Sequence, residues 1–219
     1  TVLSCIGPRR TLLDLVAPEQ LPVGTAGHIR KVRVRGTLAR LTLKLSGPIE
    51  YACRPGFAPE RSLVGEHPLD LERAFDHVKH RRMPTDPPLD IRQSGGEASV
   101  LVRCAPFQLE GGWTDARRSE LTESVLASLE RYAPEVRSIA TVTEMLTPAD
   151  LAQRYGLEGG HEMHGELALD QLGPMRPGLE LSRHLTSIEG LFCGSAGIHP
   201  GGGISGRPGR LAARAAQQG

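Results

Sequence analysis

The 219-residue chain has few aromatic residues, no long apolar run and no excess of charge of either sign. Aromatic residues make up 4% of the sequence, so the core must be built mainly from aliphatic side chains. No run of about 18 apolar residues occurs, so nothing in the sequence predicts a membrane-spanning helix. The net charge of +1, with both signs interspersed, gives no basic face, and we expect no nucleic-acid partner.

The four cysteines, at positions 5, 53, 104 and 193, are widely spaced. They form neither a Cys-x-x-Cys pair nor the dense framework of a small disulfide-rich domain, so we expect a reducing, cytoplasmic location. The sequence also lacks a signal peptide and an initiator methionine, because it opens at Thr1 and enters an apolar stretch immediately. We therefore expect that a preceding N-terminal segment is missing from this chain.

Strand and helix patterns alternate along the chain. The clearest strand alternates apolar and polar residues over 39–45, and the clearest helix starts at Thr114 and ends before Pro134. We expect strands at 2–6, 39–45, 49–53, 100–104, 136–145 and 188–193, the first of them buried and the fourth central in its sheet. We expect helices at 9–16, 69–78, 114–132, 148–155 and 211–216. These patterns predict an α/β or mixed α+β fold, and the choice between parallel and antiparallel pairing stays open.

A glycine-rich segment near the C-terminus joins an expected strand to a run of strong helix formers. Gly201, Gly203 and Gly206 have the spacing G-x-G-x-x-G, which lets a backbone approach a phosphate that faces a helix N-terminus. Strand, glycine loop and helix follow one another in the order that a dinucleotide site uses. A loop that merely turns the chain is the competing interpretation, because glycine-rich loops are often simple connections.

The position of this segment argues against an ordinary dinucleotide fingerprint. Such a motif is followed by a second strand with an acidic residue about 20 positions on. Here the chain ends thirteen residues after Gly206. We therefore interpret the segment as a supplementary wall of a cofactor site that residues outside this chain complete.

The C-terminal segment also carries a resemblance to a known family. Its sequence GLFCGSAGIHPGGGISGRPG, at 190–209, resembles the C-terminal flavin-contacting signature of the phytoene dehydrogenase-related flavoproteins, which include carotenoid desaturases, carotenoid isomerases and retinol saturase. Further stretches agree in order, at 4–14, 35–39, 104–107, 146–150, 164–172 and 175–177. The resemblance is most specific in the last fifty or so residues and weakest over 53–98.

The resemblance implies that the chain is the C-terminal part of a two-domain FAD-dependent oxidoreductase. In such enzymes an N-terminal glycine motif, absent here, binds the adenosine and pyrophosphate of FAD, and the C-terminal loop and helix close over the flavin end. The implied division places the end of an FAD-binding domain at 1–20 and a substrate-binding domain at 21–185. The closing strand, loop and helix of a Rossmann-like FAD domain then occupy 186–219.

The same resemblance implies the residues that contact the cofactor. Loop backbone would approach the pyrophosphate, ribityl chain or isoalloxazine, and the helix start would stabilise negative charge. The implied FAD-contacting residues are Cys193, Gly194, Ser195, His199, Pro200, Gly201, Gly202, Gly203, Ile204 and Gly206. The implied reaction is hydride transfer to flavin from a small apolar substrate, polyene-like or lipid, with no catalytic side chain assigned. Peripheral membrane contact is expected from the family.

Several reactive side chains receive a structural interpretation. We expect Cys193 to be a small buried hydrophobe, because no second cysteine lies close to it in the sequence. We expect the His199 ring to hydrogen-bond the loop backbone. His161 and His164 lack the spacing of four residues that puts two ligands on one helical face, so we predict no metal site.

Two other functions stay open. The chain could be a non-catalytic remnant or split subunit that binds a partner chain, or a simple nucleotide-binding module. A preceding strand with its own G-x-G-x-x-G, and an acidic residue about 20 positions later, would favour the enzyme. For this chain alone we expect neither activity nor stable FAD binding, because the adenosine half of the site is missing.

Overall fold

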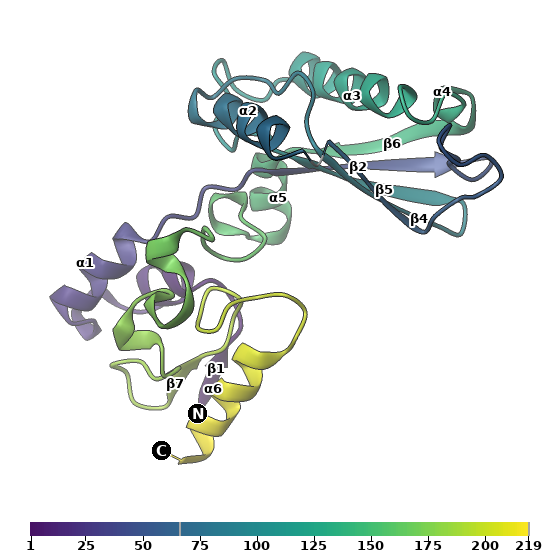
Figure 1. Ribbon diagram of the computed structural model, residues 1–219. Helices are drawn as coiled ribbons and strands as arrows, with labels where there is room; N and C mark the ends of the chain where they lie inside the picture. The colour runs from purple at the N-terminus through teal and green to yellow at the C-terminus, as the bar shows by residue number, and fades with distance from the viewer. Residues whose placement is uncertain (66, 219) are drawn as a thin grey trace. The chain divides into compact units, whose positions relative to one another are not determined.

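The computed structural model describes residues 1–65 and 67–218, which divide into two compact units. Unit 1 combines Thr1–Arg35 with the C-terminal part of the chain from Gly156 onward, and unit 2 is Gly36–Tyr155. One sheet is parallel and the other antiparallel, so the predicted mixed α/β fold is confirmed (Figure 1). The sequence-predicted boundaries after 20 and 185 both fall inside unit 1, and the assignment of each part to cofactor or substrate stays a prediction.

Unit 2 is built on a five-stranded antiparallel sheet. Its strands in sheet order are β3 (Arg61–Val64), β4 (Leu89–Ser94), β5 (Glu97–Arg103), β2 (Leu38–Leu45) and β6 (Ala140–Leu146). Strand β5 lies in the middle of this sheet, between β4 and β2, as its apolar sequence predicts. Side chains on both of its faces are at least half-buried over most of its length.

Helices cover one face of this sheet, along which α2 and α3 lie in Figure 1. The helix expected at 114–132 is present as α3 (Asp115–Glu130). The Thr114 side chain caps the start of α3, as predicted, by accepting a hydrogen bond from the Arg117 amide. Its side chains Leu121, Val125 and Leu129 are fully buried against the sheet. The remaining helices of the unit are α2 (Pro68–Lys79), α4 (Val136–Ile139) and α5 (Pro148–Tyr155).

Two expected strands are wrong in whole or in part. Residues 49–53 form no strand, because the Gln93 side chain takes the place of a partner backbone: it accepts from the Ile49 amide at 2.7 Å and donates to the Ile49 carbonyl at 2.9 Å. Residues 136–145 begin as α4, and the strand starts only at Ala140.

The helix expected at 69–78 exists, but its packing differs from that of a buried amphipathic helix. Leu69, Leu71 and Phe75 are 60%, 39% and 43% exposed, and the buried residue of α2 is Ala74. Periodicity therefore predicts that this helix forms without predicting which face it buries.

Unit 1 holds the short parallel pair β1 (Val2–Ser4) and β7 (Leu191–Cys193), with Ser4 opposite Cys193. Helix α6 (Arg207–Gln218) packs on both strands, and α1 (Val23–Lys31) lies in the same unit. Strand β1 is present as predicted, but it is not buried, since Val2 is 61% exposed. The helix expected at 9–16 is a single π-helical turn, Arg10–Asp14. Short 3-10 turns occupy Pro18–Gln20, Glu158–Gly160, Leu169–Gln171, Gly173–Met175 and Leu179–Leu181.

In the part of the chain that the structure describes, no helix is both long enough and apolar enough to cross a membrane.

Candidate functional site

The glycine-rich loop runs from the end of β7 to the start of α6, in the predicted order of strand, loop and helix. At its first residue, Gly194, a Cβ atom would lie 2.9 Å from the Ala212 Cβ and 3.2 Å from the Gly209 Cα. A side chain at 194 would therefore push α6 off the strand. This glycine serves close packing between helix and strand, one of the functions that glycines have in dinucleotide-binding units.

The first half of the loop is held by its own hydrogen bonds. The Gly194 amide donates to the Ser4 carbonyl at 2.8 Å, and the Gly197 amide donates to the buried Ser195 hydroxyl at 3.1 Å. The His199 amide donates to the Arg176 carbonyl at 3.0 Å, and the Gly201 amide donates to the Ile198 carbonyl. Of the predicted cofactor residues, Gly194, Ser195, His199 and Gly201 therefore take part in the hydrogen bonds that hold this half of the loop.

Arg176, which sequence reasoning did not single out, anchors this half of the loop. It is 1% exposed, and its guanidinium donates to carbonyls alone. The acceptors are the carbonyl oxygens of Ala196, Met163, Gly165, Glu166 and Gln171, at 2.6 to 3.4 Å. Burial lowers the pKa of Arg176. The sequence signal was limited to the Met175-Arg-Pro177 stretch, which gives no hint that the side chain is buried.

The second half of the loop presents unpaired backbone donors. Within the described residues, none of the amides of 202–206 donates a hydrogen bond. Gly203, Ile204 and Gly206 have φ angles of +106°, +58° and +62°. Positive φ is rare for a β-branched residue, and the Ile204 side chain is fully exposed. Successive amides in such a conformation form a concave donor surface that suits anionic or strongly polar acceptors.

The charges at the start of α6 favour the same kind of ligand. The first turn contains no acidic residue, although acidic side chains are the usual complement to the positive end of a helix dipole. It contains Arg207 and Arg210 instead, and both are exposed. An anion at this end would offset the unfavourable interaction between these cations and the dipole.

Cys193 lies in the hydrophobic core of unit 1, as expected for a small buried hydrophobe. Its side chain is 1% exposed, and burial raises the pKa of the thiol to about 11. Its amide donates to the His184 carbonyl, and its carbonyl accepts from His184 Nδ1 at 2.9 Å. Cys193 thus has no unbonded backbone group to offer a cofactor.

The expectation for His199 is wrong, because its Nδ1 atom is buried and has no hydrogen-bond partner among the described residues. His184 is 4% exposed, and its Nε2 is likewise without a partner in the described part of the chain. Burial lowers the pKa of His184, and a nearby charge on His199 would lower it further.

The other two histidines form no metal centre with their neighbours. No group of three His, Cys, Asp or Glu side chains within residues 1–65 and 67–218 is placed to hold a metal ion. The His161 Nδ1 atom accepts a hydrogen bond from the Met163 amide at 3.2 Å, and burial lowers the pKa of His161. His164 packs against Gly7 and Gly197.

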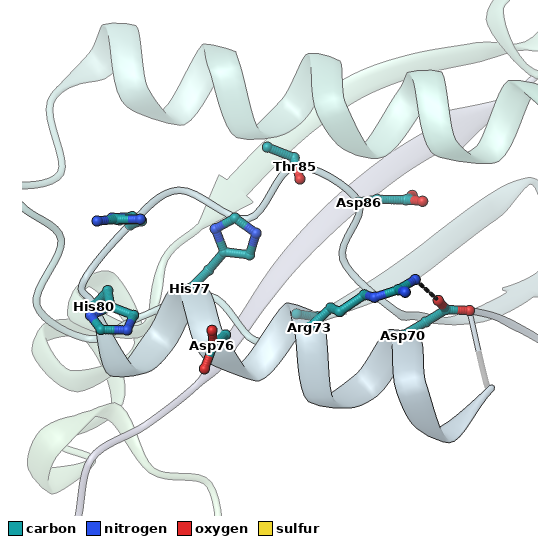
Figure 2. A pocket seen from close by; sticks show the side chains of 9 residues that line it. Asp70, Arg73, Asp76, His77, His80, Thr85 and Asp86 are labelled. Atoms are coloured by element: carbon teal, nitrogen blue, oxygen red, sulfur yellow. Dashed lines mark ion pairs between the residues drawn. The ribbon is translucent and has the colours of Figure 1, made fainter.

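Unit 2 contains a separate cavity of about 470 Å³ between α2 and the segment that follows it. Figure 2 shows Asp70 and Arg73 paired along α2, with His77 farther along the helix and Asp86 on the facing segment. The Asp70–Arg73 ion pair is 3.6 Å long and exposed, so its contribution is small. This cavity belongs to unit 2, whereas the loop at 202–206 belongs to unit 1.

The chain is similar to two curated proteins, each named pyridine nucleotide-disulfide oxidoreductase domain-containing protein 2. It is 28% identical to the protein of Rattus norvegicus over 235 residues and to that of Mus musculus over 236 residues. The matched regions cover 97% of this chain and 40% of each relative, so the chain spans well under half of their length. No family model matches the chain, and no solved structure matches it. The similarity supports a general oxidoreductase superfamily and leaves the phytoene dehydrogenase-related resemblance as a narrower hypothesis.

Proposed function

We propose that this chain forms the flavin-end part of an FAD-dependent oxidoreductase. The observation that carries the proposal is the run of unpaired amides at 202–206, directly before the start of α6. The preceding half of the loop is held in place by hydrogen bonds to other parts of unit 1. The curated relatives are named for an oxidoreductase domain, which supports the same general activity.

The loop fits a flavin cofactor at its polar groups. Carbonyl oxygens of the isoalloxazine, ribityl hydroxyls and phosphate oxygens all accept hydrogen bonds, and the loop offers successive donors of that kind. Gly202, Gly203, Ile204, Ser205 and Gly206 would hold the cofactor through their backbone amides. Bound flavin supplies the redox chemistry by accepting a hydride. Gly194, Gly197, His199 and Gly201, whose amides are bonded within the protein, orient these donors together with Arg176.

The narrower proposal is membership of the phytoene dehydrogenase-related flavoproteins, with a small apolar substrate of polyene or lipid type. It is supported by the resemblance of 190–209 to the flavin-contacting signature of that family. In this proposal a preceding segment or a partner chain supplies the adenosine and pyrophosphate half of the site. Unit 2, which lies within the substrate-binding domain predicted at 21–185, would then bind the substrate.

The test is the visible spectrum of the natural full-length protein that contains this chain, purified without denaturant. We expect flavin absorbance at about one flavin per chain. No flavin absorbance, and none gained on incubation with FAD, would exclude the enzyme. A stable complex with another chain in that case would identify the alternative, a subunit that binds a partner.

A further inference from the structure

The face of the unit 2 sheet opposite α3 is rich in arginine. Successive side chains of a strand point to opposite faces of the sheet. Because Leu41, Leu43 and Val100 lie in the core, the residues next to them in the sequence point to the other face. Cross-strand register places one row of polar side chains side by side on that face: Arg61, Arg92, Ser99, Thr42 and Glu144. A neighbouring row reads Leu63, Asp90, Leu101 and Arg40.

Cations outnumber carboxylates on this face. Among the described residues of its five strands, the cations are Arg40, Lys44, Arg61, Arg92 and Arg103, and the carboxylates are Asp90, Glu97 and Glu144. Arg61 and Arg92 are directly opposed across β3 and β4. Like charges in that position destabilise a sheet unless an anion offsets them.

The carboxylate nearest to this pair is already engaged. Asp90 is 2% exposed and accepts two hydrogen bonds from Arg61, at 3.0 and 2.8 Å. Arg103 approaches the same carboxylate at 3.6 Å. Arg92 is exposed and makes no ion pair with any residue in the described part of the chain. Arg92 therefore faces solvent without a bonded carboxylate, and its charge acts on Asp90 only at longer range.

Apolar, hydroxyl and carboxylate groups lie near this cation, with the leucines in the neighbouring row beside Asp90. Leu63 is 43% exposed beside Asp90, and Leu101 is partly exposed on the other side. A cavity of about 400 Å³ is lined by Arg61, Arg92, Ser99 and Thr42, with the exposed carboxylates Glu60 and Glu97 also on its wall. The Thr42 hydroxyl is buried and has no partner within the described residues.

We infer that this sheet face, called here the arginine face (Arg61, Arg92, Ser99, Thr42, Leu63 and Leu101), binds an amphiphile that carries a carboxylate. The carboxylate pairs with Arg92, and an aliphatic chain covers the exposed leucines. Charge complementarity selects this ligand over a neutral hydrocarbon of the same length. That such a ligand is the substrate rests on the proposed function, whereas its binding to unit 2 does not.

The test is calorimetric titration of the 219-residue chain with dodecanoate and with dodecan-1-ol, each kept below the concentration at which it aggregates. We expect dodecanoate to bind at least about tenfold more tightly than the alcohol. Arg92→Gln should raise the Kd of dodecanoate about fivefold, as the loss of one exposed ion pair predicts. Arg92→Lys should restore part of the affinity because it keeps the charge.

Arg82→Gln is the matched control, because Arg82 is also an exposed arginine of unit 2 that forms no ion pair with the described residues, and it lies outside the arginine face. It should leave the Kd unchanged. The inference would be overturned if the acid and the alcohol bound equally tightly, or if the two glutamine variants had equal effects. It would also be overturned if inorganic phosphate alone competed for the site as well as dodecanoate does. The titration needs no flavin, so the two proposals can fail separately. Dodecanoate binding by this chain, together with a natural full-length protein that neither contains nor gains flavin, would reject the proposed function and keep this site.

Discussion

Gly194 and Ala212 are in such close contact that a methyl group on Gly194 would lie 2.9 Å from the Ala212 Cβ. This contact sets how closely α6 approaches the end of β7, and hence where the donor amides at 202–206 begin. The position of the candidate site therefore depends on a glycine whose own backbone is bonded to Ser4.

Gly194→Ala should destabilise the protein, because neither the strand end nor the helix backbone can give way cheaply. We expect the free energy of unfolding to fall by about 1–3 kcal/mol. Urea denaturation measures this. Gly27→Ala is the control: Gly27 lies in α1 with nothing within 4 Å of an added Cβ, so its substitution should be neutral or stabilising. Equal effects of the two changes would contradict the close contact.

Arg176→Met should destabilise unit 1 more strongly. The side chain keeps its approximate length, but the carbonyls of Ala196, Met163 and Gly165 lose their donor inside the protein. We expect a loss of about 3 kcal/mol or more, with faster amide exchange at Gly197 and Ile198. Arg183→Met, an exposed position in the same unit, should change neither quantity. Unchanged exchange in Arg176→Met would show that the loop has another anchor.

Thiol labelling should distinguish the four cysteines. Cys5 and Cys53 are exposed, whereas Cys104 and Cys193 are buried, and burial raises the pKa of both buried thiols. An aromatic disulfide reagent at mildly alkaline pH should therefore modify two thiols rapidly and the others only on unfolding. Rapid reaction at Cys193, identified by peptide mass, would reopen a redox interpretation of that residue.

Asp90 should give the folded protein a measurable dependence on acid. The hydrogen bonds from Arg61 hold the pKa of Asp90 below its ordinary value. Its contribution to stability is thus complete above the unfolded-state value of about 4 and is lost as pH falls through the lower folded-state pKa. Urea unfolding between neutral pH and about pH 3 should show a steeper fall for the natural chain than for Asp90→Asn. Parallel curves would contradict the Arg61–Asp90 interaction.

Local patterns predicted the elements that bury a regular face. Period-two alternation located β2, and the spacing of Leu121, Val125 and Leu129 located α3, because each pattern reports one side packed against a core. The same reasoning failed at 49–53, where the Gln93 side chain replaces a partner strand. It also failed for α2, whose apolar residues stay exposed. A side chain that hydrogen-bonds in place of a partner strand leaves no periodic pattern in the sequence.

The sequence predicted that a strand, a glycine-rich loop and a helix follow one another at the candidate site. It did not predict which loop residues hold the loop in place and which have amides free to bind a ligand. Spacing identified the glycines and the helix behind them, and the resemblance supplied the flavin. It could not separate Gly194, Gly197, Ile198, His199 and Gly201, whose amides are bonded within the protein, from 202–206, whose amides donate no hydrogen bond to the described residues. That separation depends on Arg176 and Ser4, which reach the loop from distant parts of the sequence. Contacts of this range are set by the tertiary fold.

The most direct test of the central proposal is the flavin affinity of two matched valine variants in the natural full-length protein. Gly203 and Gly112 have φ angles of +106° and +78°, and an added Cβ would meet nothing within 4 Å at either position. Each Gly→Val change should therefore cost a similar 1–3 kcal/mol or so of backbone strain. We predict that Gly203→Val raises the Kd for FAD at least about tenfold and that Gly112→Val leaves it unchanged. Equal FAD affinity in the two variants would contradict the assignment of 202–206 to the cofactor.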